Sequence, residues 1–377
     1  MNGIEVIILL LLLFMTVPDF CRWLGRPALR YPLFVVFGLV LSPFAGTNAA
    51  GMLQEAGQVG FLLLLFEVGL EIDLPPIRQL LVPLRKAMWW ILLQYPVILA
   101  LGRLAGLHWL GCFIAAAAFT GCSVGMAHAG WRHFQGIADK PKHQLLMMMV
   151  VLEIIAIVLL SVETALYESG LTWLVGLKLV GISITVLIIS QVSTKLRHLF
   201  ELILARATRW RVYLVVFLVL LVCAVGERLG LSAIKTAFFL GLFMSRIQHD
   251  NQRLEDYIAP ISRRFLIPIF FVSLGLQVPL AQLASYTGLM SVAAAAVLFG
   301  WRLIIQRRFV PTGGGDRSLL LLCPNLTIAA LAGNILLTDG SAFRAAVWIL
   351  LTGLIVSISA ILLLPKNRAD AEMRKEA

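Results

Sequence analysis

Glu153 lies in the middle of the apolar run Gln144 to Val162, with nine residues on each side that carry no other charge. A carboxylate inside a membrane is costly, and ionisable residues there mark ion or proton pathways. A proton and a cation compete for the same two oxygens of a buried carboxylate, because each neutralises it. The position therefore predicts that Glu153 binds a proton or a monovalent cation.

Two further segments carry small or polar residues where a lipid-facing helix would carry Leu and Val: FTGCSVGMAHAG from Phe119 and LCPNLTIAALAGN from Leu322. Close packing of helices through small residues is one interpretation. The other is a pair of broken helices whose free carbonyl groups and helix ends meet in the middle of the membrane and hold an ion. The residues expected at that crossing are Thr120, Cys122, Ser123, Pro324, Asn325 and Thr327. Asn325 or Thr120 would compensate the partial charges of the helix ends.

Glu67 is a second candidate, one helical turn from Glu71 on the same helix face. The alternative for Glu67 is an ion pair with a Lys or Arg near the cytoplasmic face. His128 at the end of a span would shuttle protons or sense pH, or else it is simply solvated there. The other charges in or beside the spans are expected to reach the membrane interface: Lys178, Lys235, Glu227 and Arg302.

The elements that position these residues are membrane helices. Of the 377 residues, 60% are hydrophobic and only 14% are charged, and the mean hydropathy is +0.92. A spanning helix needs about 20 mostly apolar residues, so this length accommodates about a dozen spans and leaves no room for a separate soluble domain. The sequence predicts an all-α integral membrane protein with about thirteen spans: 4–17, 31–45, 55–72, 86–104, 108–127, 144–164, 172–193, 210–226, 231–246, 264–279, 284–304, 318–337 and 343–364.

The basic residues alternate between successive connections. The first connection holds Arg22, Arg26 and Arg30, whereas the second has no Lys or Arg, and the pattern continues to the basic C-terminal tail. By the positive-inside rule the N-terminus is expected outside and the C-terminus in the cytoplasm, in the inner membrane of a bacterium. The net charge of +11 is then explained by topology and lipid headgroups, so no nucleic acid is expected as a partner.

The five cysteines have no paired spacing, so the sequence indicates neither a disulfide framework nor a metal site, and no cofactor is expected. The first apolar segment begins almost at Met1 without a basic region or a cleavage site. It is therefore expected to be a retained helix and not a signal peptide.

Two pairs of segments about two hundred residues apart are alike. VVFGLVLSP from Val35 is similar to AFFLGLFMSR from Ala237, and LLLLFEVGLEIDL from Leu62 is similar to LIPIFFVSLGLQVPL from Leu266. The predicted topology gives the two copies opposite orientations. Inverted repeats of this kind are typical of secondary transporters.

These motifs resemble a known family. GLVLSP, the stretch from Gly60 to Asp73, the helix of small residues, the carboxylate helix, GLFMSR and RRFLIPIFFVSLGL follow one another as in the monovalent cation:proton antiporters. The similarity covers about residues 30 to 335 and is greatest to the second branch, with the Kef-type potassium efflux proteins and sodium/hydrogen exchangers. It implies thirteen helices, two crossed broken helices, a homodimer and alternating access. The whole chain, 1–377, is then one transporter domain, with core spans at 55–164 and 264–364 and dimerisation spans at 4–45 and 172–246.

The chain departs from the family pattern at several positions. The family's membrane Asp, preceded by Asn, Asp or Gln, corresponds to Glu153 preceded by Leu152, and its Ser-Ser-Thr corresponds to Cys122, Ser123 and Val124. The Gly-Glu-Phe-like segment is replaced by residues 324–326, and the nearest counterparts of a basic residue in the tenth span are Arg263 and Arg264. The chain ends at Ala377, so the nucleotide-binding domain of Kef-type proteins is not expected.

The resemblance implies a transporter, not an enzyme, that exchanges K⁺ or Na⁺ for protons. One titrating carboxylate beside Leu152 predicts electroneutral, one-for-one exchange. Three alternatives remain open from the sequence: a Kef-like potassium efflux path, a symporter of organic anions on the same fold, and a scaffold or sensor that does not transport. The expected partners are a monovalent cation, protons, membrane lipid and a second copy of the chain.

Overall fold

A computed structural model describes most of the chain: residues 3–71, 77–124, 126, 137–169, 210–228, 233–245, 248–249, 252–338 and 342–364. These parts are helical apart from connections and one small hairpin, in which β1 (Gln248–His249) pairs antiparallel with β2 (Gln252–Arg253). The expected all-α class is confirmed.

Seven of the described helices are long and apolar enough to cross a membrane, and four shorter apolar helices accompany them. Every predicted span contains a described helix except the segment 172–193, which lies outside the described residues. Lipid takes the place of water around such helices, so large apolar side chains such as Ile4 and Met15 are exposed in the protein alone.

The chain divides into two compact units. The first comprises Met1–Phe14, Phe44–Leu74 and Leu171–Leu276. Besides the first part of α1 (Gly3–Trp23) and the hairpin, its described elements are α3 (Thr47–Glu71), α9 (Arg211–Arg228), α10 (Ala233–Met244), α11 (Leu254–Ile261), the π-helical η2 (Ser262–Leu266) and α12 (Ile267–Leu276).

Within this unit α3 packs against α10 and α12 with their backbones in close contact. A Cβ atom added to Gly241 would collide with the Phe66 carbonyl group, and one added to Gly69 would collide with the Phe238 carbonyl. Small residues at a helix crossing allow such an approach. The glycines of the motifs FEVGL and LGLFM therefore have a packing role.

The second unit comprises Met15–Pro43, Pro75–Gly170 and Gln277–Ala377. Its described elements, besides the rest of α1, are η1 (Pro27–Leu29), α2 (Arg30–Leu41), α4 (Ile77–Leu104), α5 (Trp109–Thr120), α7 (Asp139–Ser169), η3 (Leu280–Ala284), α13 (Tyr286–Arg308), α14 (Ser318–Leu321), α15 (Leu326–Thr338) and α16 (Phe343–Leu363).

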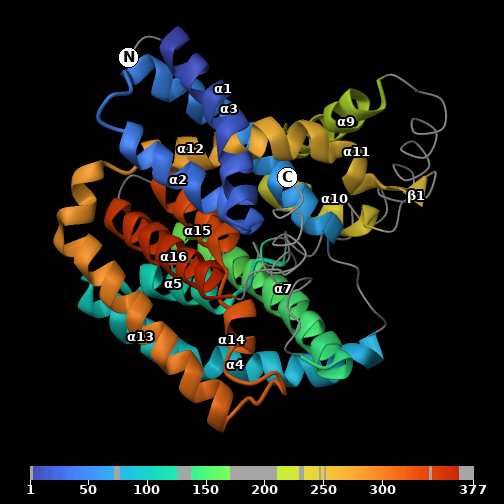
Figure 1. Ribbon diagram of the computed structural model, residues 1–377, viewed down its shortest axis with the longest axis vertical. Helices are drawn as coiled ribbons and strands as arrows, with labels where there is room; N and C mark the ends of the chain where they lie inside the picture. The colour runs from blue at the N-terminus through green and yellow to red at the C-terminus, as the bar shows by residue number, and fades with distance from the viewer. Residues whose placement is uncertain are drawn as a thin grey trace. The chain divides into compact units, whose positions relative to one another are not determined.

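Helix α16 lies at the centre of the second unit. It packs against α15, α13, α5 and α2, and Figure 1 shows it in red beside α15. Trp348 of α16 is fully buried, and its ring meets the Phe119 ring of α5 edge to face at 5.4 Å between centroids. The long apolar helices of this unit thus surround short ones, α5 and α15, that carry the candidate site.

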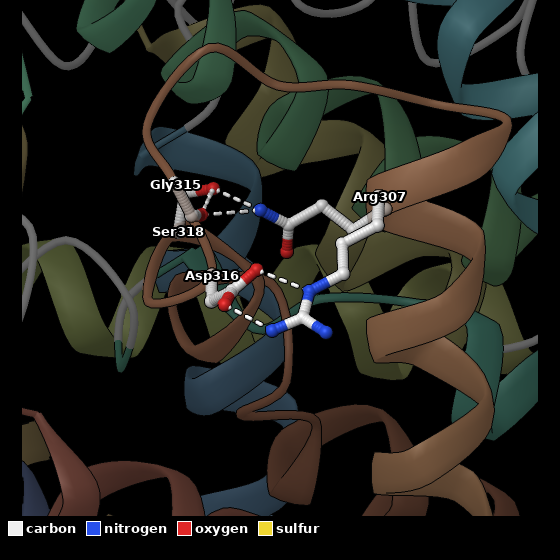
Figure 2. Close-up of polar contacts among 5 residues, drawn as sticks. Arg307, Gly315, Asp316 and Ser318 are labelled. Carbon is white, nitrogen blue, oxygen red and sulfur yellow. Dashed lines mark hydrogen bonds and ion pairs between the residues drawn. The ribbon is translucent and has the colours of Figure 1, made fainter.

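The connection between α13 and α14 folds back on the end of α13 (Figure 2). Gln306 donates to the Gly315 carbonyl at 2.5 Å and to the Ser318 hydroxyl at 2.6 Å, while Arg307 binds both carboxylate oxygens of Asp316. Gly315 has a φ of 71°, in the left-handed region that favours glycine. These contacts fix the start of α14, which leads directly to the second helix break.

Candidate ion-binding site

Two helices of the second unit are interrupted at the predicted places. Helix α5 ends at Thr120 and is followed by non-helical backbone at residues 121–123, and residues 322–325 separate α14 from α15. The 12 residues of α5 rise about 18 Å, whereas the hydrocarbon core is about 30 Å thick. Helix α5 is therefore too short to span the hydrocarbon core by itself, which agrees with a broken helix.

The two interruptions bind each other directly. The Ser123 amide donates to the Pro324 carbonyl at 2.7 Å, and the Thr327 amide donates to the Ser123 hydroxyl oxygen at 3.2 Å. The hydroxyl groups of Ser123 and Thr327 also form a hydrogen bond, and the Cys122 thiol donates to the Leu321 carbonyl at 3.4 Å. The structure thus brings together Cys122, Ser123, Pro324 and Thr327, four of the residues expected at this crossing.

Gly121 allows the crossing to form. A Cβ atom on this residue would lie 2.5 Å from Cδ1 of Ile328 and 2.7 Å from Cβ of Ala156. Its backbone is extended, at φ −70° and ψ 166°, a conformation open to any residue. The requirement for glycine is therefore one of space between α5, α15 and α7.

Glu153 projects from α7 to the first interruption. The residue is 1% exposed, and its Oε2 accepts a hydrogen bond from the Val124 amide at 3.3 Å. Val124 follows the break directly, so a backbone amide freed by the interruption is directed at the carboxylate. Leu152 beside it is fully buried and has no group able to bind a cation.

Asn325 connects the two helix breaks. Its carbonyl oxygen accepts the Ala329 amide at the start of α15, and its side-chain amide donates to the Phe119 carbonyl at 3.4 Å. The Ser357 hydroxyl of α16 accepts from the Asn325 backbone amide at 3.1 Å. This agrees with the predicted compensation of helix ends by Asn325. Thr120 instead turns its hydroxyl back to the Ala116 carbonyl of its own helix, at 2.8 Å.

Arg302 was expected at the membrane interface, and this prediction is wrong. Its side chain extends from α13 into the second unit, where the residue is fully buried. Nε donates to Oε1 of Gln94 at 2.8 Å, and Nη2 donates to the Phe119 carbonyl at 2.5 Å. A cation at the C-terminal end of α5 offsets the partial negative charge of that end.

The sequence contained the signal for Arg302. It is the one charged residue between Tyr286 and Gln306. A charge isolated in an apolar run is costly in a membrane, so Arg302, like Glu153, is expected to face the interior of the protein. Gln94, an isolated amide within α4, is a weaker signal of the same kind.

Glu67 belongs to the first unit and is bound by two side chains there. The Ser262 hydroxyl donates to Oε1 of Glu67, and Nε of Arg263 donates to Oε2 at 2.9 Å. Both donors lie on the π-helical turn η2. The ion pair with an arginine, which was the structural interpretation of Glu67, is therefore the one found.

The other charged residues singled out from the sequence lie outside the described side chains or on the surface of their helices. Glu71 is the last residue of α3, and its side chain lies outside the described part of the chain, as do His128 and Lys178. Lys235 is half-buried on α10, and Glu227 is exposed on α9.

The crossing offers the groups that a monovalent cation requires. The Glu153 carboxylate, the hydroxyls of Ser123 and Thr327 and the Pro324 carbonyl are oxygen donors contributed by α7 and the two interrupted helices. Oxygen ligands from unwound backbone and small side chains bind Na⁺ and K⁺ in transporters. Among the described residues no cluster of three His, Cys, Asp or Glu side chains is suited to a tightly bound metal ion.

Comparison with known proteins identifies the family of the chain. The model of the family described as sodium/hydrogen exchanger, transmembrane, matches residues 8–369. A relative from Methanocaldococcus jannaschii, the probable Na⁺/H⁺ antiporter 3, is 24% identical over 351 residues, which cover 88% of this chain and 87% of the relative. The Na⁺/H⁺-K⁺ antiporter GerN of Bacillus cereus is 24% identical over 266 residues, covering 68% of this chain and 66% of GerN.

The fold is also found among solved structures. The sodium proton antiporter MjNhaP1 from Methanocaldococcus jannaschii, solved at pH 8, superposes with a TM-score of 0.69 at 15% sequence identity. The match covers 98% of this chain and 97% of MjNhaP1. By its sequence over nearly its whole length, and with a fold shared with a sodium/proton antiporter, the chain belongs to the sodium/hydrogen exchanger family.

Proposed function

We propose that this protein exchanges a monovalent cation, K⁺ or Na⁺, for protons by electroneutral alternating access, with Glu153 as the shared binding residue. The observation that carries the proposal is the buried Glu153 carboxylate at the crossing of two interrupted helices. Membership of a family of cation/proton antiporters supports the reaction class.

The exchange uses the competition between two ions for one carboxylate. Ionised Glu153, with the hydroxyl oxygens of Ser123 and Thr327 beside the Val124 amide, binds the cation. Protonation of Glu153 removes the negative charge and with it the attraction for the cation. The site thus carries the same charge with either ion bound, so exchange of one ion for the other moves no net charge.

Three other groups at the crossing position the site. Asn325 and Arg302 donate to the Phe119 carbonyl at the end of α5, and Thr120 donates to the turn before it. Free carbonyls inside a membrane cost several kcal/mol each when left without a donor. These side chains therefore keep the interrupted helix stable whether or not a cation is bound.

The proposal names both Na⁺ and K⁺ because the candidate site does not distinguish between them. Na⁺ and K⁺ use the same oxygen ligands, and selection between them depends on the size and rigidity of the cavity. The name of the relative GerN includes both ions.

The proposal includes an orientation and an assembly. The alternation of basic residues supports an external N-terminus and a cytoplasmic C-terminus, and a bacterial inner membrane is the proposed location. The family resemblance supports a homodimer, with dimerisation spans at 4–45 and 172–246 and transporting spans at 55–164 and 264–364.

Everted membrane vesicles test the reaction. A proton gradient is established, Na⁺, K⁺ or Li⁺ is added, and the internal pH is followed with a fluorescent dye. Wild-type protein is expected to release the gradient on addition of Na⁺ or K⁺, and Glu153→Gln is expected to abolish this response. Glu55→Gln is a matched control, because Glu55 is an exposed acid of α3 and its loss leaves the response intact.

The same assay separates the alternatives. An efflux path would move K⁺ without coupled protons, and an organic-anion symporter or a scaffold would give no proton movement that depends on the cation. A cation-dependent response that persists in Glu153→Gln at the wild-type rate would contradict the assignment of the site.

A further inference from the structure

Helix α7 carries a second buried carboxylate, which the antiport mechanism above does not use. Glu163 is 7% exposed and lies ten residues beyond Glu153. The Tyr95 hydroxyl of α4 donates to its Oε1 at 3.1 Å. Its other oxygen, Oε2, is buried and has no hydrogen-bond partner among the described residues.

No described cation neutralises Glu163. Helix α7 packs against α4, α5 and α15, and of these α15 carries no titratable group and α5 only Cys112. On α4, Lys86 donates to the Pro311 carbonyl, Arg103 donates to the Leu107 carbonyl, Arg85 is exposed, and the Arg78 side chain lies outside the described residues. Tyr95 is the described α4 group bonded to Glu163. The other charged groups of α7 are Glu153, those of its first turns (Asp139, Lys140, Lys142 and His143), and Glu168 near its end, whose side chain lies outside the described residues.

Neither the ionised nor the protonated form of Glu163 therefore finds all of its partners among the described residues. The ionised carboxylate has one neutral donor and no counter-ion, while the protonated acid has a hydroxyl on Oε2 with no acceptor in the described part of the chain. A pair that only joined α4 to α7 would work equally well with a Gln or Thr, at a lower cost of burial. A carboxyl group with a free, buried oxygen is suited to binding and releasing a proton.

The position of Glu163 separates it from the crossing. Ten residues of α-helix correspond to about 15 Å along the axis, too far for direct proton transfer to Glu153. Glu163 lies one residue before the end of the apolar span Asp139–Thr164, at the end opposite to Lys140 and Lys142. It therefore lies between the proposed ion site and one membrane surface.

We propose that Glu163 is a second proton-binding residue, which takes up a proton at this end of α7 and, with Tyr95, sets the proton dependence of exchange. The proposal rests on the proposed antiport function. In the uptake step one proton adds to Oε2 and the carboxylate becomes a neutral acid. Tyr95 keeps its own proton and remains the donor to Oε1, and release reverses the step.

Infrared difference spectroscopy of the reconstituted protein tests proton binding without transport. Spectra are recorded between about pH 5 and pH 9, the range in which buried carboxyl groups titrate. The expected result is a carboxylic acid band that is lost in Glu163→Gln, kept in Glu153→Gln and shifted in Tyr95→Phe. The absence of any titrating band that depends on Glu163 would overturn the proposal.

Transport assays test the consequence for exchange. At saturating cation, Glu163→Gln is expected to shift the proton concentration for half-maximal exchange by about tenfold or more, one pH unit. Tyr95→Phe, which keeps the shape of the side chain, is expected to shift it to a smaller extent. Thr164→Val is the control, because among the described residues the Thr164 hydroxyl bonds to the Leu160 carbonyl of its own helix.

The results distinguish the two proposals. Exchange that is lost in Glu153→Gln but has the wild-type pH profile in both Glu163→Gln and Tyr95→Phe would overturn the role of Glu163 alone. A lower melting temperature with an unchanged profile would identify a merely structural pair and overturn it as well. A wild-type protein without cation/proton exchange would contradict the proposed function, and the infrared experiment would still decide proton binding.

Discussion

Among the described residues of the second unit, three acidic or basic side chains are buried within apolar stretches of helix, and each has a different partner. Glu153 accepts a backbone amide, Arg302 donates to an amide oxygen and a carbonyl, and Glu163 accepts one hydroxyl. Burial of an uncompensated charge costs several kcal/mol, so these contacts limit what each group is able to do. Arg302 donates to two neutral acceptors and is suited to positioning the interrupted helix α5, whereas the two carboxylates are suited to changes of protonation.

Removal of the Arg302 guanidinium is predicted to destabilise the protein. Arg302→Met leaves the Gln94 oxygen and the Phe119 carbonyl without this donor inside the unit, at a cost of about 2–5 kcal/mol. Arg302→Lys keeps the charge but loses the planar fork, so a smaller loss is expected. The measurement is the melting temperature in detergent from intrinsic tryptophan fluorescence.

Arg307→Lys is the control for this comparison, since Arg307 is exposed at the end of the same helix. Equal melting temperatures for Arg302→Met and Arg307→Lys would show that the buried contacts contribute nothing.

Gly121→Ala is predicted to disturb the crossing through overpacking. Its methyl group would approach Ile328 and Ala156 to less than 3 Å, and an extra methyl in a packed core costs about 1–3 kcal/mol. Exchange is expected to fall together with the melting temperature, because the displaced backbone carries Ser123 and Val124.

Gly300→Ala is the control for Gly121→Ala. A Cβ atom there meets nothing within 4 Å, and alanine favours the helix by about 0.5–1 kcal/mol. The reverse order of stability would refute the packing argument.

The candidate site is predictable from sequence only in part. Glu153 and the residues of the two breaks are recognisable because charge, Pro, Ser and Asn are anomalous in an apolar run. Their partners are not, since Gln94 and Phe119 are 208 and 183 residues away from Arg302 along the chain. Side chains at such separations are brought together by the fold, and one sequence carries no local signal for the pairing.

At the scale of elements, interruption of two helices creates groups that the rest of the unit must satisfy. Helix α5 exposes carbonyls at its C-terminal end, and these bind donors from α13 and from the start of α15. Helix α15 begins with the Thr327 amide bound to Ser123 of the other interruption. The two breaks therefore stabilise each other, and a change in one is expected to be transmitted to the other.

The connection from α13 to α14 gives a prediction in which burial outweighs charge. The Ser318 hydroxyl is fully buried and bonds Gln306, Thr312 and the Gly315 carbonyl, so Ser318→Ala is expected to cost about 1–3 kcal/mol. Asp316→Asn removes an exposed ion pair and is expected to have a smaller effect (Figure 2). The two variants are compared by melting temperature.

The pH dependence of this comparison follows from the ion pair. Hydrogen bonding from Arg307 lowers the pKa of Asp316. The stabilisation by this ion pair is therefore complete at a pH above the ordinary pKa of an aspartate, and it is lost as the pH falls through the lowered pKa of Asp316. The small difference between wild type and Asp316→Asn is expected to vanish in acid, while the deficit of Ser318→Ala persists. If the lower melting temperature of Ser318→Ala also returned to the wild-type value in acid, the contribution of Ser318 would not come from its buried hydrogen bonds.

At the scale of the whole molecule, the apolar pattern predicted twelve helices at places where the structure describes one. The division into two units could not be predicted from the sequence. It depends on contacts between helices far apart in the chain, such as the close approach of α3 and α10 at Gly69 and Gly241. The inverted repeat stays a prediction, supported by matching interruptions in α5 and between α14 and α15. Hydropathy reports which residues face apolar surroundings, but not which helix provides them.

The stoichiometry of exchange is predicted at this same scale, because it concerns the charge of the entire cycle. One-for-one exchange moves no net charge, so flux reverses where the cation and proton gradients are equal, at any membrane potential. A cycle that moved one net charge would gain about 2.3 kcal/mol per 100 mV, which displaces the reversal ratio about 50-fold. Proteoliposomes with and without an imposed potential of about 100 mV are expected to reverse at ratios that agree within about twofold. Glu153→Gln vesicles measure the leak, and a displacement near 50-fold in wild type would mean that each cycle carries a second proton across the membrane.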